Sequence, residues 1–184
     1  MNRDESLKLA LDEGVELADP DPRWRRRFAA ERRRLMRRMP GAFAAIEHFG
    51  STAVHGLRAK PIIDLLAGVP TGVPLESLIP QLQRCGYDYV PALNQGFDGR
   101  RWLLRHRDGK RTHQLHLVTI GSREWIDRLQ FRDALRSDLA LEARYQALKE
   151  DLARRFPHDR DAYNAGKERF IRRAVGVGRQ SATH

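Results

Sequence analysis

The chain has 184 residues, of which 41% are hydrophobic and 32% charged, and it contains one cysteine. This length suits one hydrophobic core, and the composition is typical of a soluble globular protein. A single cysteine excludes an internal disulfide and a thiolate zinc cage, and no apolar run approaches the roughly 20 residues of a membrane span. The acidic N-terminal stretch has no apolar signal core, so we expect a cytoplasmic protein with no membrane contact.

The formal net charge of +10 favours anionic partners: a nucleotide, a phosphorylated metabolite or nucleic acid. Much of the excess lies in a predicted helix over residues 22–39, which follows an alternating segment, Gly14–Asp19, that predicts an edge strand. The helix places its apolar residues near helical spacing and leaves an arginine-rich outer face. That face is interpreted as solvated surface, with RNA binding as the alternative.

The middle of the chain alternates predicted strands with one helix. Strands are expected over 42–49, 61–69, 87–90, 100–105 and 112–120, with a helix over 75–86 that is closed by Gly86. Three helices follow over 122–136, 138–155 and 158–174. We therefore predict an α/β (α+β) fold with a mixed β-sheet flanked by helices and a helical C-terminal third. The prediction is a single domain over 14–175 between flexible segments 1–13 and 176–184.

A polar turn followed by a strand with a carboxylate is the main functional signal. Gly50 can bring a backbone close to a phosphate, and the hydroxyls of Ser51 and Thr52 can donate to its oxygens. Asp64 lies in the apolar strand that follows and could hold a divalent metal against that phosphate, with Lys60 adding positive charge. The alternative is a structural aspartate satisfied by backbone donors.

Other side chains are candidates for the same site. Arg111 on the last predicted strand and Lys167 on the last helix could bind phosphate. His116 is a candidate metal ligand or proton carrier, and Glu47 a further carboxylate ligand; alternation places His113 on the opposite face from His116. Mg²⁺ or Mn²⁺ is the expected metal, with Zn²⁺ as the less favoured choice.

Four motifs in order resemble the GrpB family, an uncharacterised family of the nucleotidyltransferase superfamily. They cover about 15–171 and are Glu47-His48-x-Gly50-Ser51-Thr52, Gly56-Leu57-x-Ala59-Lys60-Pro61-Ile62-Ile63-Asp64, Arg111-Thr112-His113-x-Leu115-His116 and Tyr163-x3-Lys167-x2-Phe170-Ile171. The resemblance implies a nucleotidyltransferase-like fold in which Gly50 and Ser51 match the superfamily Gly-Ser and Asp64 its first aspartate. Leu66 stands at the position of the second aspartate, and residues 112–120 contain no carboxylate for the third.

Three functional hypotheses follow. The first is a nucleotide-binding protein, or one that binds another ATP-like or phosphorylated small molecule, with possible nucleotidyl transfer at Asp64 and His116. The second is a non-catalytic accessory domain assisting dephospho-coenzyme A kinase, since the resemblance extends to domains fused to that enzyme. The third is RNA binding through the arginine-rich helix, which would depend steeply on salt.

Overall fold

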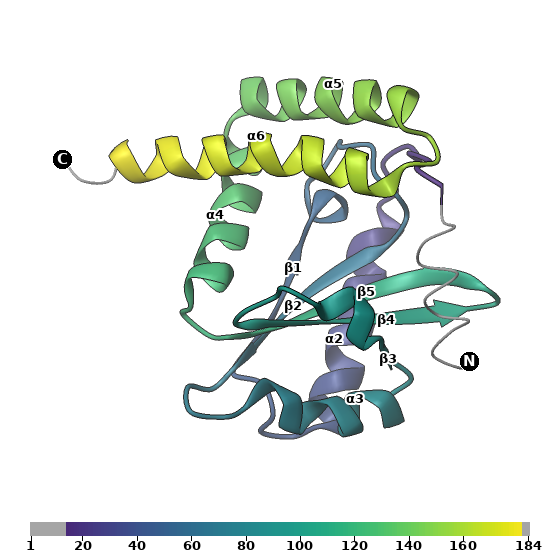
Figure 1. The fold of residues 1–184 in the computed structure, drawn as a ribbon, viewed down its shortest axis with the longest axis vertical. Helices are drawn as coiled ribbons and strands as arrows, with labels where there is room; N and C mark the ends of the chain where they lie inside the picture. The colour runs from purple at the N-terminus through teal and green to yellow at the C-terminus, as the bar shows by residue number, and fades with distance from the viewer. Residues whose placement is uncertain (1–13, 182–184) are drawn as a thin grey trace.

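The computed structural model describes residues 14–181, with the side chains of 14–176. Its centre is a five-stranded mixed sheet in the order β1-β2-β5-β4-β3 (Figure 1). β2 and β5 run parallel, and the other neighbouring pairs run antiparallel. The strands are β1 (Ala45–Phe49), β2 (Ile63–Val69), β3 (Asp88–Tyr89), β4 (Arg100–Arg107) and β5 (Lys110–Thr119).

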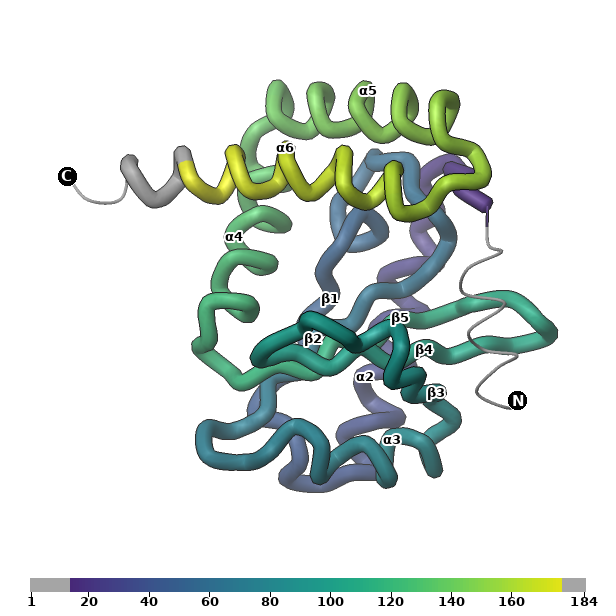
Figure 2. Tube along the Cα trace, in the orientation of Figure 1, coloured from purple at the N-terminus to yellow at the C-terminus, as the bar shows by residue number. Residues whose placement is uncertain are grey.

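Helices cover both faces of the sheet, which confirms the predicted mixed α/β class and the helical C-terminal part. One face packs against α2 (Arg23–Arg38), the short turn η2 (Leu75–Leu78) and α3 (Ile79–Arg84). On the other side lie α4 (Arg123–Ser137), α5 (Leu139–Arg155) and α6 (Arg160–Ser181), with α5 and α6 running alongside each other (Figures 1 and 2). The chain between β1 and β2 passes beneath these last helices, where Val54 and Leu57 pack against α4 and α5.

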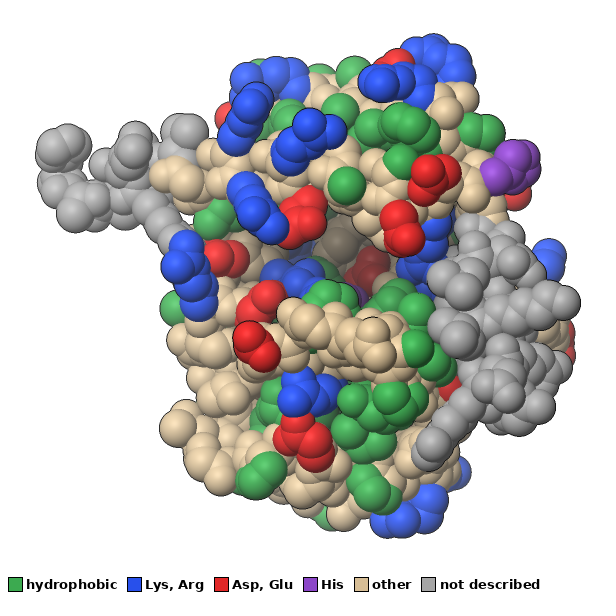
Figure 3. All heavy atoms as spheres, in the orientation of Figure 1, with side chains coloured by type: hydrophobic (Ala, Val, Ile, Leu, Met, Phe, Trp, Pro, Cys, Tyr) green, Lys and Arg blue, Asp and Glu red, His purple; other side chains and the backbone are tan. Residues whose placement is uncertain are grey.

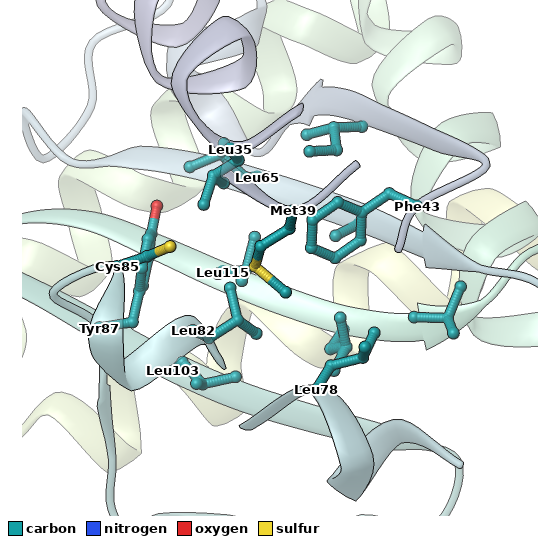
Figure 4. Close-up of a cluster of buried hydrophobic side chains, with 14 of the residues drawn as sticks. Leu35, Met39, Phe43, Leu65, Leu78, Leu82, Cys85, Tyr87, Leu103 and Leu115 are labelled. Carbon is teal, nitrogen blue, oxygen red and sulfur yellow. The ribbon is translucent and has the colours of Figure 1, made fainter. Parts of the chain in front are cut away.

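The main hydrophobic core lies between the sheet and α2 with α3 (Figure 4). Alternate residues of β2 point into it: Ile63 and Leu65 have no solvent exposure. Leu35 and Met39 come from the end of α2 and the residue after it, and Leu82 reaches in from α3 (Figure 4). The period of two along β2 therefore leaves Asp64 on the opposite face of the sheet, toward the C-terminal helices.

Two predicted elements differ from the structure. Gly14–Asp19 forms only an isolated bridge between Ala18 and Ala59, because its apolar Val15 packs against α5 and α6 rather than beside a strand. The predicted helix over 75–86 begins as the turn η2, because Pro80 lacks an amide hydrogen and fits only the first turn of the α-helix that follows.

The helix starts predicted for the last third are confirmed by side-chain caps. Ser122 accepts a hydrogen bond from the amide of Trp125, and Asp138 accepts one from that of Leu141. α6 extends past the predicted end at 174, while the flexible segment predicted for 1–13 and the end of the tail lie outside the described residues. Within 14–181, no helix combines the length and apolarity needed to cross a membrane.

A buried carboxylate fastens α2 to the sheet. Glu31 is 4% exposed and accepts hydrogen bonds from Arg34 on its own helix, from Arg105 of β4 at 2.6 Å and from the hydroxyl of Tyr87 at 2.8 Å. Burial alone would raise the pKa of Glu31, but the bonds from Arg34 and Tyr87 and the charges of Arg105 and Arg34 outweigh it and hold the pKa below the ordinary 4.5.

We predict that Glu31→Gln lowers the free energy of unfolding by about 2 kcal/mol at pH 7, because it removes the charge that neutralises Arg34 and Arg105. A depressed pKa stabilises the fold above the ordinary pKa and ceases to do so as pH falls through the folded value. The difference in the free energy of unfolding between the variant and the wild type, measured by urea unfolding, should therefore decrease below about pH 4.5. Glu16→Gln, at an exposed glutamate, is the control; an equal loss there would contradict the prediction.

Candidate functional site

The candidate site lies on the sheet face that the C-terminal helices cover. Asp64 of β2 pairs with Phe49 of β1 on one side and with Gln114 of β5 on the other. Two residues further along, Leu66 pairs with His116 on the same face. The structure therefore brings Asp64, the end of β1 and the middle of β5 together on one face of the sheet.

Gly50 lies directly against the Asp64 carboxylate. It has φ +72°, and a Cβ built there would stand 2.3 Å from Oδ2 and 2.9 Å from Cγ of Asp64. Only glycine combines this backbone conformation with so close an approach. Gly50 and Asp64 are fourteen residues apart in the sequence, yet the glycine turn and the aspartate strand are in contact.

Basic side chains from four parts of the chain surround Asp64. Burial raises the pKa of Asp64 to about 6, and the positive charges of Lys167, Lys60, Arg128 and Arg111 oppose that rise. Lys60 precedes β2, and the other three lie on α6, α4 and β5. Figure 3 shows a hollow between α6 and the segment leading into β4, with basic, acidic and histidine side chains on its floor. We call the surroundings of Asp64 that Lys60, Arg111, Arg128 and Lys167 share the Asp64 recess.

Lys167 is held against an aromatic ring in this recess. Its ammonium lies 4.2 Å from the ring centroid of Tyr163, one turn earlier on α6. Burial and then the charge of Lys60 lower the pKa of Lys167 to about 7, while Asp64 opposes the shift. An added anion next to Lys167 would favour its protonated form, as Asp64 does.

The two hydroxyls of the turn have different surroundings. Ser51 shares a hydrogen bond with Tyr145 of α5 on the recess side. Thr52 donates to the carbonyl of Ile62 at 3.2 Å and lies 3.0 Å from Nε2 of His48, on the side of α2. Because the hydroxyl proton goes to Ile62, the imidazole donates to Thr52. Ser51 thus lies on the side of the recess, whereas the hydroxyl of Thr52 joins β1 to the segment before β2.

His116 is buried in a setting that keeps it neutral. Burial lowers its pKa well below the usual range, and Arg128 and Arg100 lower it further. Nη1 of Arg100 lies 3.3 Å from Nδ1, and a guanidinium only donates, so Nδ1 accepts and Nε2 carries the proton. The Phe49 ring packs edge-on at 5.0 Å. The lone pair that a metal would need is therefore directed at an arginine.

Glu47 is held away from a metal role by another arginine. Its carboxylate accepts from Arg132 of α4 at 2.8 Å, and its partner across the sheet is the fully buried Leu66. Across the described residues, no three His, Cys, Asp or Glu side chains lie close enough together to hold a metal ion. Two-metal chemistry needs a cluster of anionic ligands. The residues around Asp64 do not fit the divalent metal that the resemblance implies.

Three contributors to the recess were not predicted from the sequence. Arg128 projects from α4, with its guanidinium 5.5 Å from the Phe49 ring centroid, and Arg100 comes from β4. Tyr145 comes from α5. Trp102 of β4, flanked by the guanidinium groups of Arg111 and Arg160 at 5.7 and 5.5 Å, is a further neighbour. No local spacing marks these residues, since each reaches the recess through tertiary packing.

The chain is a mixed α/β protein in which a glycine turn contacts an aspartate on a central strand of a five-stranded sheet. The model of the family described as GrpB protein matches residues 14–176, and the chain belongs to that family. The chain is 34% identical to a UPF0157 protein of Pseudomonas aeruginosa, over 95% of this chain and 72% of the relative. It is 31% identical to the glutamate-rich protein GrpB of Alkalihalophilus pseudofirmus, over 89% and 95%.

A solved structure shares the fold. The crystal structure of the conserved protein GrpB from Enterococcus faecalis matches with a TM-score of 0.74 and 32% identity, covering 88% of this chain and 98% of that one. A dephospho-CoA kinase of Mycolicibacterium paratuberculosis is 28% identical over 87% of this chain but only 45% of its own length. The resemblance seen in the motifs is therefore confirmed at the level of the family and the fold.

The contact between Gly50 and Asp64 gives a matched experiment. We predict that Gly50→Ala destabilises the protein by about 1–3 kcal/mol more than Gly72→Ala, because both glycines have positive φ but only the first would meet a neighbouring atom within 4 Å. Urea unfolding of both variants measures the difference.

The double variant Gly50→Ala/Asp64→Ala should recover part of that extra loss, since it removes the carboxylate that the new methyl group meets. Equal losses for the two glycine variants, or no recovery in the double variant, would show that the close approach does not constrain the turn.

Proposed function

We propose that this protein binds a nucleotide or another phosphorylated small molecule in the Asp64 recess. The observation that supports the proposal is the convergence of Lys60, Arg111, Arg128 and Lys167 on a single carboxylate. Arg128 is also bonded to Glu124 at 2.9 Å, and burial, followed by the charge of Lys60, lowers the pKa of Lys167 to about 7. A phosphate group, which carries close to two negative charges at neutral pH, would be attracted by these side chains and would favour the protonated form of Lys167.

The surroundings add hydrogen-bond donors of the kinds that suit phosphate. Lysine supplies a compact charge, and arginine supplies paired donors in a fork that matches phosphate oxygens. Ser51 lies at the start of the 3₁₀ turn η1 (Ser51–Ala53), and its bond with Tyr145 faces this side of the sheet.

Binding is the function that this chemistry supports, rather than nucleotidyl transfer by two metal ions. Asp64 matches the first aspartate of the superfamily, but Leu66 and Gln114 provide no further carboxylate on the shared face. Asp64 can accept a proton, and its pKa of about 6 leaves it ionised at neutral pH. Release of pyrophosphate from nucleoside triphosphates is the assay for transfer.

Calorimetric titration with ATP and with inorganic pyrophosphate tests the proposal. We expect saturable binding that Lys167→Gln weakens by about tenfold, the effect of losing one charge-assisted contact. Arg169→Gln is the matched control, because this exposed arginine lies on the same helix but two residues on, where it faces a different direction. Absence of binding, or equal weakening by the two variants, would remove the proposal; unfolding of each unliganded variant checks that α6 is intact.

A second candidate function is assistance to a dephospho-coenzyme A kinase. It is favoured by the similarity to the Mycolicibacterium paratuberculosis enzyme, in which the matched region spans less than half of the chain. In this role the recess would hold a phosphorylated substrate or product next to a separate kinase. The two functions share the recess but differ in the need for a partner protein.

Mixing the purified protein with the dephospho-coenzyme A kinase of the same cell tests this role. We expect a complex in analytical ultracentrifugation and slower heat inactivation of the kinase. Unchanged sedimentation and an unchanged rate of inactivation would count against it, and Lys167→Gln tells whether the recess takes part in any complex that forms.

A further inference from the structure

We propose that the Asp64 recess binds its phosphate ligand as a free anion, with protein cations in the place that divalent metals take in nucleotidyl-transfer sites. The inference rests on the proposed function and concerns how the ligand is recognised. It assigns to Lys60, Lys167 and Arg111 the direct neutralisation of phosphate charge. The ligand class is therefore a phosphate or polyphosphate that is not chelated by a metal ion.

The donor set around Asp64 is unsuited to a divalent cation. Mg²⁺ and Mn²⁺ select carboxylate and other oxygen ligands, usually more than one carboxylate for a dedicated protein site. Here the carboxylate of Glu47 is bonded to Arg132, and Nδ1 of His116 is bonded to Arg100. The position two residues after Asp64 is Leu66, which is fully buried in an apolar cluster with Phe49 and Val118.

Positive side chains take up the surroundings in which a metal ion would have to sit. Lys60, Arg111, Arg128 and Lys167 all act on Asp64, and they come from four separate elements of the fold. A divalent ion placed beside Asp64 would be repelled by each of them. The same charges attract a phosphate that approaches the recess from solvent.

The backbone leaves little room for a metal ion on one side of the carboxylate. The Cβ position of Gly50 lies 2.3 Å from Oδ2 of Asp64, so the glycine turn is in contact with that oxygen. Asp64 then acts within the protein, where its charge favours the protonated form of Lys167. The carboxylate is thus a negative counter-charge for Lys167, and a bound phosphate would add further negative charge beside it.

The test compares binding with and without metal. ATP, pyrophosphate and inorganic phosphate are titrated into the wild-type protein in EDTA, and then in excess Mg²⁺ or Mn²⁺ at matched ionic strength. We expect binding in EDTA at least as tight as in metal, and several-fold weaker binding of ATP once Mg²⁺ chelates it. Titration of Mn²⁺ alone, followed by its electron paramagnetic resonance signal, should show no tight site.

Asp64→Asn separates the two modes of recognition, with Asp127→Asn, in the middle of α4, as a second acidic control. A free anion should bind Asp64→Asn about three- to tenfold more tightly, because a like charge has been removed. A ligand that binds through a metal ion should bind Asp64→Asn more weakly than the wild type, and should bind the wild type only when metal is present. That result would overturn the inference while leaving the proposed function standing. Absence of binding of every probe under both conditions would overturn the inference and the proposed function together.

Discussion

The approach of the Gly50 backbone to the Asp64 carboxylate is the constraint around which this side of the molecule is arranged. A carboxylate on a buried strand loses hydration, and the structure must supply positive charge in return. Because Gly50 closes one side of Asp64, that charge comes from above the sheet, where α4 and α6 present Arg128 and Lys167. The placement of α4 and α6 over the sheet thus determines which positive charges act on Asp64.

Strand alternation divides the polar residues between two separate roles. Asp64 and His116 share the face that α4 and α6 cover, whereas His48 and Thr52 join β1 to the segment before β2 on the other face. Glu31 closes that second face by holding α2 to the sheet. Glu31, His48 and Thr52 thus have defined partners on one face, whereas Asp64 on the other face is surrounded by basic side chains.

Much of the fold follows from local signals in the sequence, as the strand around Asp64 and the capped starts of α4 and α5 show. Asp64 itself stands out because a charge interrupts an apolar run. The partners of the candidate residues do not stand out, since Arg132 reaches Glu47 and Arg100 reaches His116 only through tertiary packing. The sequence alone therefore identifies Glu47 and His116 as candidate metal ligands, but not the arginines to which they are hydrogen-bonded.

The position of Lys167 depends on how closely α6 approaches α5. A Cβ at Gly166 would stand 2.5 Å from a methyl group of Leu152, so the absence of a side chain there lets the two helices come together. Lys167 is the next residue, and Tyr163, one turn earlier, supports its ammonium. The glycine that permits helix packing thus also sets where a positive charge enters the recess. Electrostatic preorganisation at Asp64 is in this way a consequence of how the last two helices pack, and not only of which charged residues the sheet carries.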